Sequence, residues 1–366
     1  MNQTAMTRSA IVEKYRREFP APKSLFIDFG GCVIETRVNS SDLLTDLNNY
    51  FKEFLVDAEK GDILITAHEC PAVDLGLEYT VKQPDPGKTK IKEEFHDLPD
   101  GRVVYKRLTG MIFVFGGGEN IAIGPCIENS NQLINFINNR FIEFKLNNGC
   151  YLGHAAGVIE NGRGIAMAGF SGMGKSTLAL HLMSRGTTFV SNDRIMAEEN
   201  AEDNGNSLTM YGVAKQPRIN PGTALNNPDL SCIVAPEDKE KFISMPKEEL
   251  WELEHKYDAL IDECYGKDKF ILKAPMSGLV ILNWQRDNSE TEIKIVDPKE
   301  RKDLLPAFMK GTGLFYLPDS PKNEMDPDVD AYADFLSKTT LIEISGGVDF
   351  DKAADACLKF MKEGKL

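Results

Sequence analysis

The chain has 366 residues, of which 42% are hydrophobic and 27% are charged, so it is long enough for about two globular domains. Its formal net charge of −14 argues against a protein whose main task is to bind DNA or RNA, because such binding depends on a basic surface. No run of about 18 apolar residues occurs, and residues 1–20 lack the apolar core of a signal peptide, so we expect neither a membrane span nor a secretory leader.

The seven cysteines are odd in number and form no Cys-x-x-Cys pair. This pattern argues against a disulfide framework or a zinc site, and it favours reduced, mostly buried thiols. We therefore expect a cytoplasmic protein that has neither a membrane nor a nucleic acid as a partner.

The first 125 residues predict a small N-terminal α+β domain. Apolar residues recur at helical spacing in 42–56, and residues 1–19 also look helical. The predicted strands are 24–37 with a Gly-Gly break, 62–67, 102–107, 110–115 and 119–124. A loop rich in Pro, Gly and Lys is expected around 83–89.

Residues 126–366 are expected to form a second α/β domain with a C-terminal α/β extension. A predicted hairpin joins strands 155–159 and 165–168 through Asn161-Gly162-Arg163-Gly164. A helix over 175–185 and a strand over 187–190 follow, with Gly186 as the helix stop. The other predicted elements are helices 129–144, 248–263 and 350–362, strands 210–213 and 278–284, and a surface loop over 318–329.

Residues 169–176 read Gly-Phe-Ser-Gly-Met-Gly-Lys-Ser, the Gly-x-x-x-x-Gly-Lys-Ser pattern of a phosphate-binding P-loop. The glycines let backbone N–H groups converge on phosphate oxygens, and the following helix points its positive end at the same anion. Lys175 would reach the β- and γ-phosphates, and the Ser176 hydroxyl would bind Mg²⁺. A chance match in a glycine-rich turn is the alternative, but the strand before and the helix after the pattern disfavour it. The sequence thus predicts binding of ATP and Mg²⁺ by Gly169, Ser171, Gly172, Met173, Gly174, Lys175, Ser176 and Thr177.

Asn192 and Asp193 lie at the carboxyl end of the strand that follows the predicted P-loop helix. Ligands of open α/β sheets bind at the carboxyl ends of strands, so Asp193 should come close to the γ-phosphate. A carboxylate there can hold Mg²⁺ or accept a proton from an attacking hydroxyl. The alternative is an ordinary turn-forming Asn-Asp pair.

The segment 153–196 resembles the P-loop core of the HPr kinase/phosphorylase family, and is closest to its divergent members. The shared landmarks are His154-Ala155, the Gly162-Arg163-Gly164 hairpin, the loop Ser171–Ser176, Arg185-Gly186, and Asn192-Asp193-Arg194. The resemblance implies an α/β fold with a P-loop core of the HPr-kinase/PEP-carboxykinase-like type. It also implies a kinase activity and, since the family commonly forms oligomers, a homo-oligomer.

Three positions near this core carry open alternatives. The family has aspartate where this chain has Asn192, and because asparagine cannot act as a base, either Asp193 carries both duties or phosphorolysis is lost. By resemblance His154 lies near the transferred phosphoryl group, although it could instead be structural. The segment 215–223 could present Arg218 and Lys215 to a phosphate or an acidic substrate, or it could be a turn with solvated basic residues.

The leading hypothesis is a kinase that transfers the γ-phosphoryl group of ATP to a hydroxyl of a protein serine or a small molecule. Its catalytic residues would be Asp193, Lys175, His154 and Arg218, with Ser176 and Asp193 as metal ligands. A catalytically weakened ATP sensor or ATPase regulatory module is the alternative, and Asn192 favours it mildly. A carboxykinase-type enzyme is a third option, and it would need a cluster of arginines facing the loop, for which Arg218 and Arg194 are the candidates.

Overall fold

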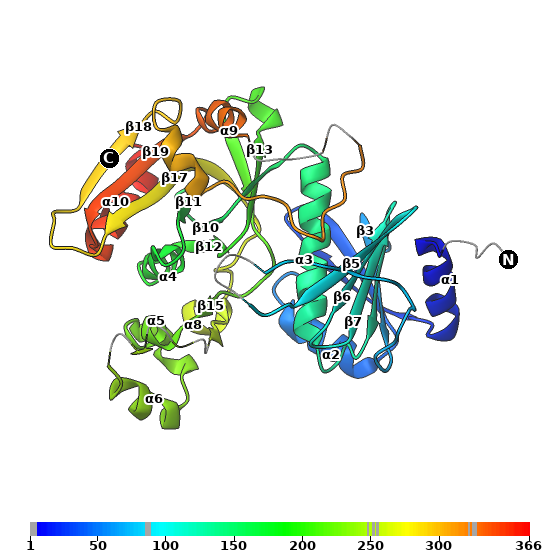
Figure 1. Cartoon of the computed structure of the whole chain (residues 1–366). Helices are drawn as coiled ribbons and strands as arrows, with labels where there is room; N and C mark the ends of the chain where they lie inside the picture. The colour runs from blue at the N-terminus through cyan, green and yellow to red at the C-terminus, as the bar shows by residue number, and fades with distance from the viewer. Residues whose placement is uncertain are drawn as a thin grey trace. The chain divides into compact units, whose positions relative to one another are not determined.

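The structure, a computed structural model, describes residues 6–84, 89–246, 249–250, 253, 256–320, 323 and 328–366. The chain folds as two compact units, drawn in Figure 1. Unit 1 comprises Met1–Asn148 and Thr312–Met325, and unit 2 comprises Gly149–Gly311 and Asp326–Leu366. The observed division therefore falls after residue 148 and not after 125, and a late segment of the chain returns to unit 1.

Unit 1 is built on one mixed sheet. The strand order is β1-β2-β3-β8-β7-β6-β5-β4, with β2, β3 and β8 parallel to one another and the remaining neighbours antiparallel. The strands are β1 (Lys23–Asp28), β2 (Val33–Val38), β3 (Ile63–Glu69), β4 (Thr80–Val81), β5 (Glu93–Leu98), β6 (Gly101–Lys106), β7 (Met111–Gly116) and β8 (Glu119–Gly124). The predicted break at Gly30-Gly31 is confirmed, because both glycines have positive φ between β1 and β2.

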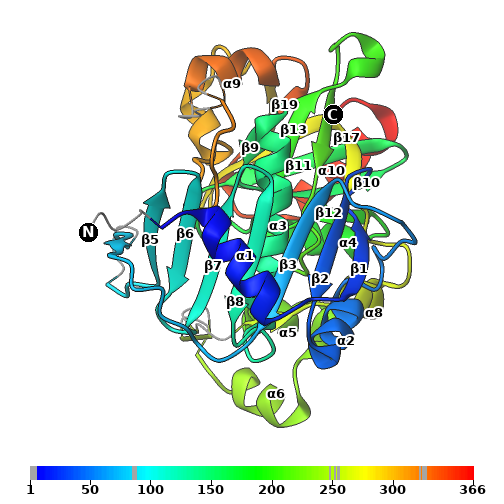
Figure 2. The ribbon, with the colours of Figure 1, turned by 90° about the vertical axis from the view of Figure 1, so that its right-hand side faces the viewer.

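Helices cover both faces of this sheet. Figure 2 looks onto the face covered by α1 (Arg8–Glu18), whose Ile11, Val12 and Tyr15 pack against β6, β7 and β8. On the other face, α2 (Ser41–Tyr50) contacts β1 and β2, and α3 (Ser130–Asn147) contacts β3 and β8. The predicted helix over 129–144 is thus confirmed as a helix, but it belongs to unit 1.

Unit 2 is also a mixed α/β structure. Its main sheet runs β12-β10-β11-β17-β14-β13-β9, and β19 adds to β17 with β18 beyond it. The strands are β9 (Tyr151–Gly153), β10 (Ala155–Glu160), β11 (Arg163–Gly169), β12 (Thr188–Ser191), β13 (Ile195–Glu199), β14 (Leu208–Tyr211), β17 (Lys273–Gln285), β18 (Glu292–Val296) and β19 (Thr340–Gly347). The predicted hairpin is confirmed: β10 and β11 pair antiparallel around Asn161 and Gly162, both at positive φ.

The two faces of the unit 2 sheet carry different helices. On one face lie α4 (Lys175–Met183) and α10 (Phe350–Glu363), and Phe360 fills the space where a side chain at Gly278 would stand, 2.7 Å from the ideal Cβ position. On the other face, η3 (Lys302–Ala307) and α9 (Val329–Leu336) join the core that contains Leu279 and Ile281. The phosphate-loop candidate therefore lies on the α4 side of a sheet that is covered on both faces.

A mostly helical insert separates β14 from β17. It contains β15 (Arg218–Ile219), α5 (Pro221–Leu225), η2 (Pro228–Ile233), α6 (Pro236–Ile243), β16 (Tyr257–Asp258) and α8 (Ile261–Tyr265). The predicted helix 248–263 is wrong at 257–258, which form β16 paired with β15, and several of its residues lie outside the described ones. The expected loops at 83–89 and 318–329 also fall partly outside the described residues.

Among the cysteines whose side chains the structure describes, six are free thiols, and five of these are buried. This agrees with the expectation of reduced, buried cysteines. Within the described residues, no helix combines the length and the apolar character that a bilayer-spanning helix needs.

Candidate active site

A glycine-rich turn connects β11 to α4, at the place where the sequence predicts a P-loop. Gly172 and Gly174 both have positive φ, at +82° and +91°, a conformation that residues with a Cβ rarely adopt. Gly174 also occupies the N-cap position of α4, and no side chain caps the helix there. The first turn of α4 therefore keeps backbone N–H groups available for an anion.

Lys175 folds back over this turn. Its Nζ donates a hydrogen bond of 2.7 Å to the carbonyl oxygen of Gly169, at the other end of the loop. Burial lowers the pKa of Lys175, Asp193 opposes that shift, and the positive charges of Arg194 and Lys310 lower the pKa further. Lys175 is thus a partly buried cation whose ammonium group connects the two ends of the loop.

An aromatic pair supports the turn from the α10 side. The indole Nε1 of Trp284 donates to the carbonyl oxygen of Met173 at 2.9 Å, and the Trp284 ring packs edge-on against Phe350. These rings and Val348 line a cavity of about 420 Å³ beside Gly172, Gly174 and Thr177. Trp284 and Phe350 could not be identified as site residues from the sequence, because their position depends on the end of β17 meeting the start of α10.

Gly174→Ala and Gly172→Ala form a matched pair that tests how tightly this turn is built. Both substitutions place a Cβ at positive φ, which costs about 1–2 kcal/mol. A Cβ at residue 174 would also stand 2.7 Å from Cζ of Phe350, whereas nothing lies within 4 Å of one at residue 172. We expect Gly174→Ala to lower the free energy of unfolding in urea by about 1–3 kcal/mol more than Gly172→Ala does. Equal losses would contradict the packing described.

Asp193 lies in the turn between β12 and β13. Its Oδ1 is 3.0 Å from Nε2 of His154, and its Oδ2 accepts from the guanidinium of Arg194. Burial alone would raise the pKa of Asp193, but the hydrogen bond from His154 and the positive charges of Arg194 and Lys215 outweigh burial and hold the pKa well below its ordinary value. Asp193 is therefore an ionised carboxylate with more than half of its side chain exposed.

His154 is held in place by its backbone. It follows β9, and its N–H donates to the carbonyl oxygen of Phe308 at 2.7 Å. The same stretch brings Lys310 to this end of the sheet, since the Lys310 N–H donates to the Leu152 carbonyl at 3.1 Å. No signal in the sequence pointed to Lys310, because its position arises from a pairing across more than 150 residues.

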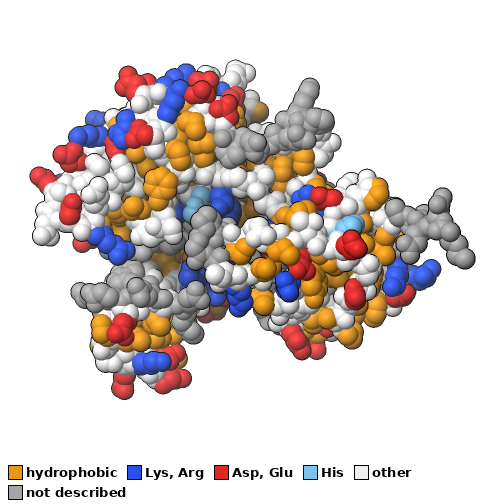
Figure 3. All heavy atoms as spheres, in the orientation of Figure 1, with side chains coloured by type: hydrophobic (Ala, Val, Ile, Leu, Met, Phe, Trp, Pro, Cys, Tyr) orange, Lys and Arg blue, Asp and Glu red, His pale blue; other side chains and the backbone are white. Residues whose placement is uncertain are grey.

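The sheet topology explains why Asp193 and the loop share one edge. β12 and β11 each pair antiparallel with β10, so they run in the same direction and their carboxyl ends lie at the same edge. The two strands are not neighbours, because β10 lies between them and the parallel neighbour of β11 is β17. Figure 3 shows Lys and Arg side chains grouped beside a histidine on one face of the molecule.

The polar segment 215–223 reaches this region through two contacts. The Oγ1 atoms of Thr223 and Thr177 are 3.5 Å apart, so the start of α5 lies against the first turn of α4. Burial lowers the pKa of Lys215, with Asp193 opposing and Arg218 and Arg194 lowering it further, so Lys215 lies among the charges of the site. Arg218 itself pairs with Asp258 at 3.3 Å. Of these two cations, Lys215 interacts electrostatically with Asp193, and Arg218 pairs with Asp258.

Asn192 differs from its neighbour in the same turn. Its side-chain Oδ1 is buried and has no hydrogen-bond partner among the described residues. A buried amide oxygen without a donor costs free energy, and it is the kind of exception found at functional sites. The Asn192 amide cannot accept a proton from a hydroxyl, so Asp193 is the residue of this pair that could act as a base.

No group of three or more His, Cys, Asp or Glu side chains that could hold a metal occurs among the described residues. Ser176 and Asp193 therefore fit a Mg²⁺ ion only if phosphate oxygens and water supply most of its ligands. Mg²⁺ is commonly bound in this way, by one or two carboxylates together with substrate phosphates.

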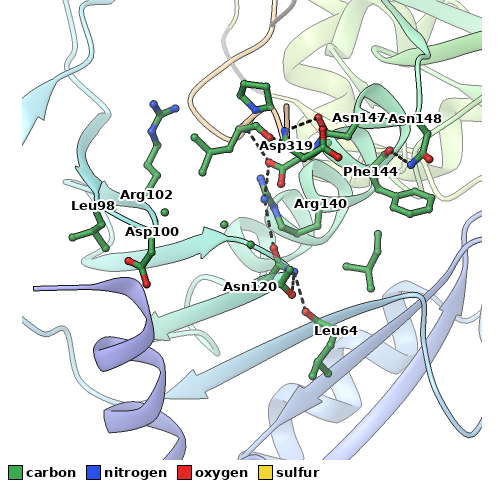
Figure 4. A pocket seen from close by; sticks show the side chains of 18 of the residues that line it. Leu64, Leu98, Asp100, Arg102, Asn120, Arg140, Phe144, Asn147, Asn148 and Asp319 are labelled. Atoms are coloured by element: carbon green, nitrogen blue, oxygen red, sulfur yellow. Dashed lines mark hydrogen bonds and ion pairs between the residues drawn. The ribbon is translucent and has the colours of Figure 1, made fainter. Parts of the chain in front are cut away.

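A second and larger cavity, of about 800 Å³, lies in unit 1 (Figure 4). It is bounded by the glycine turn 116–118, by the C-terminal half of α3 and by residues 317–319. Its two arginines are engaged in structure: Arg102 binds Asp97, and Arg140 binds Glu143 and the Phe315 carbonyl. The bond from Arg140 to Phe315 attaches the returning segment to α3, and we assign both arginines a structural role.

No family model and no curated protein matches this chain. Among solved structures, the Hpr(Ser) kinase/phosphatase from Coxiella burnetii is similar over 58% of this chain and 93% of its own, with 14% sequence identity and a TM-score of 0.28. A TM-score this low gives the likeness no weight as an argument.

Proposed function

We propose that the protein transfers the γ-phosphoryl group of ATP, in the presence of Mg²⁺, to a hydroxyl group of a protein serine or a small molecule. The observation that carries the proposal is the pairing of a phosphate-loop geometry with an ionised carboxylate at one sheet edge. The loop of Gly172, Gly174 and Lys175 would bind the triphosphate, and Asp193 would contact the hydroxyl of the acceptor.

Binding of ATP would use three features of unit 2. The N–H groups at the start of α4 would face the phosphates, and Lys175 would exchange its bond to the Gly169 carbonyl for phosphate oxygens. The cavity beside Trp284, Val348 and Phe350 has an apolar wall and enough volume for the nucleobase. Mg²⁺ would neutralise phosphate charge, with Ser176 and Asp193 as its protein ligands.

The transfer step would form one bond and break another. The acceptor oxygen bonds to the γ-phosphorus, the bond from that phosphorus to the β–γ bridging oxygen breaks, and ADP leaves with the electron pair. The hydroxyl proton passes to Asp193, which His154 and Arg194 orient. Because the pKa of Asp193 is low, the carboxylate acts mainly by aligning the hydroxyl and takes the proton late in the transfer.

A catalytically weakened ATP sensor remains the second candidate. Asn192 favours it, because this residue is an amide where the resembling family has an aspartate, so the turn holds one carboxylate and not two. The sensor would bind ATP through the same loop and transfer nothing, so the two functions differ in whether any acceptor becomes labelled.

Lys175→Ala tests the nucleotide site shared by both candidates. Removing a charged partner from the phosphate clamp should weaken the binding of ATP with Mg²⁺ by about 2–4 kcal/mol. Isothermal titration calorimetry measures this loss, and Lys362→Ala, at an exposed position of α10, is the matched control. Equal ATP affinity for the wild-type protein and Lys175→Ala would contradict the assignment of the loop.

A further inference from the structure

Trp284 lies beside the phosphate loop because β17 extends beyond the end of β11. The two strands are parallel, and Gly169, the last residue of β11, pairs with Leu282. Trp284 is two residues further along β17, so its side chain leaves the same face of the sheet as that of Leu282. At this level the chain of β11 has already turned into the loop, and the indole therefore contacts the loop backbone.

One hydrogen bond joins Trp284 to the loop. The indole Nε1 donates to the carbonyl oxygen of Met173 at 2.9 Å, and Trp284 is only 2% exposed. Water therefore competes little for the indole N–H, and a hydrogen bond in such surroundings is stronger than one in bulk solvent. The position of the Met173 carbonyl oxygen is thus fixed by a buried side chain from outside the loop.

The bond to Met173 also sets the direction of the next N–H group. The peptide bonds of the described residues are all trans, so the carbonyl of Met173 and the N–H of Gly174 point in opposite directions. The carbonyl points at Trp284, and the N–H points away from it. No group among the described residues accepts a hydrogen bond from the Gly174 N–H. This N–H is therefore a donor left open for an anion at the start of α4.

Gly174 does not fix this direction by itself. Its φ is +91°, and glycine adopts positive and negative φ about equally readily, so the peptide between Met173 and Gly174 could rotate. Rotation would turn a carbonyl oxygen toward the phosphates in place of an N–H. Two contacts oppose it: the hydrogen bond from Trp284, and the ring of Phe350, whose Cζ is 2.7 Å from the ideal Cβ position of Gly174.

Resting on the proposed kinase function, we propose that Trp284 is a positioning residue for ATP, because its indole N–H holds the Met173 carbonyl outward and so keeps the Gly174 N–H directed at the phosphates. Trp284 acts on the phosphates through the loop backbone and not by direct contact. The Gly174 donor is aligned before the triphosphate arrives, so binding does not have to turn the peptide. Lys175 differs, since its Nζ must leave the Gly169 carbonyl before it can bind phosphate.

The test removes the indole N–H and keeps the aromatic ring. In one variant 3-benzothienylalanine replaces Trp284, so that a sulfur atom takes the place of the N–H in a side chain of nearly the same shape. Trp284→Phe is the second variant. Calorimetric titrations give the Kd of the full-length protein for ATP and for inorganic tripolyphosphate, each with Mg²⁺. Tripolyphosphate has no base or ribose, so it reports on the loop alone. Circular dichroism at the titration temperature checks that each variant is folded.

We expect both variants to bind ATP and tripolyphosphate about 5- to 30-fold more weakly, as for a misaligned hydrogen bond to a charged group. Phe335→Leu is the matched control. Phe335 is a buried aromatic residue of the same unit that stacks on Tyr151, and it belongs to the core on the other face of the sheet. This variant should lose stability and keep the wild-type Kd for both ligands, which separates a role in the loop from a role in folding.

The outcomes separate this inference from the proposed function. Wild-type Kd values for both ligands in the benzothienylalanine variant overturn the inference and leave the kinase function standing. A loss confined to ATP, with unchanged tripolyphosphate binding, also overturns it, because Trp284 would then act on the base and not on the loop. Binding of neither ligand by the wild-type protein overturns both the inference and the nucleotide site on which it rests.

Discussion

Replacing Asp193 by asparagine is expected to slow phosphoryl transfer by about 100- to 10,000-fold, the range for loss of a positioned general acid or base. Asparagine has nearly the same shape as aspartate and can still accept a hydrogen bond from His154 or Arg194. It lacks the charge that aligns the acceptor hydroxyl and receives its proton. Single-turnover measurements with labelled ATP isolate this step from binding and product release.

The control for Asp193→Asn is Asp268→Asn. Asp268 is exposed and has a φ of +61°, a conformation that asparagine tolerates well. The Asp268→Asn variant should therefore transfer phosphate at the wild-type rate. Asp193→Asn should still bind ATP through the Lys175 loop, so its defect should appear in kcat. A transfer rate within about 3-fold of wild type would remove Asp193 from the mechanism.

Replacing Arg140 by alanine is expected to destabilise unit 1 by about 3–5 kcal/mol. The Arg140 side chain is 1% exposed, and it donates to Glu143 at 2.8 Å and lies over the Phe115 ring. Burial raises the pKa of Glu143 although the positive charge of Arg140 opposes this, so the carboxylate depends on its partner. Alanine would leave Glu143 buried without its cation, which is the costly outcome for a buried pair.

The same substitution should loosen the segment that returns to unit 1. Arg140 donates to the Phe315 carbonyl oxygen, and Glu143 accepts from the Leu317 N–H at 3.1 Å. We expect faster amide hydrogen exchange at 314–319 together with a lower urea midpoint. Arg140→Met combined with Glu143→Leu removes both charges and should recover most of the stability. A loss below about 1 kcal/mol for Arg140→Ala would mean that the pair is not buried as described.

Local patterns were enough to predict much of the fold. The hairpin around Asn161-Gly162 was predictable because those residues favour the positive φ of a tight turn, and the P-loop pattern fixed the start of α4. Strands β1 to β3 and β6 to β8 of unit 1 followed from their apolar runs between turn residues, whereas β4 and β5 were not predicted. In each case the decisive information lies within about ten residues, which is the range over which sequence patterns act.

The parts that sequence did not predict depend on distant pairings. β19 was not predicted, and its place beside β17 joins residues about 60 apart. The division into units differs from the expected one because α3 packs on the unit 1 sheet, and Phe315 and Leu317 of the late segment bond to Arg140 and Glu143 of α3. Lys310 and Trp284 join the candidate site in the same way, through contacts that only the folded sheet creates.

The most direct test of the proposed kinase function is transfer of label from γ-labelled ATP. The full-length protein is incubated with Mg²⁺ and a lysate or metabolite panel, with Asp193→Asn in parallel. We predict a labelled acceptor in the wild-type reaction and almost none with the variant. Tight ATP binding with no labelled acceptor in any fraction would contradict a kinase and favour an ATP sensor.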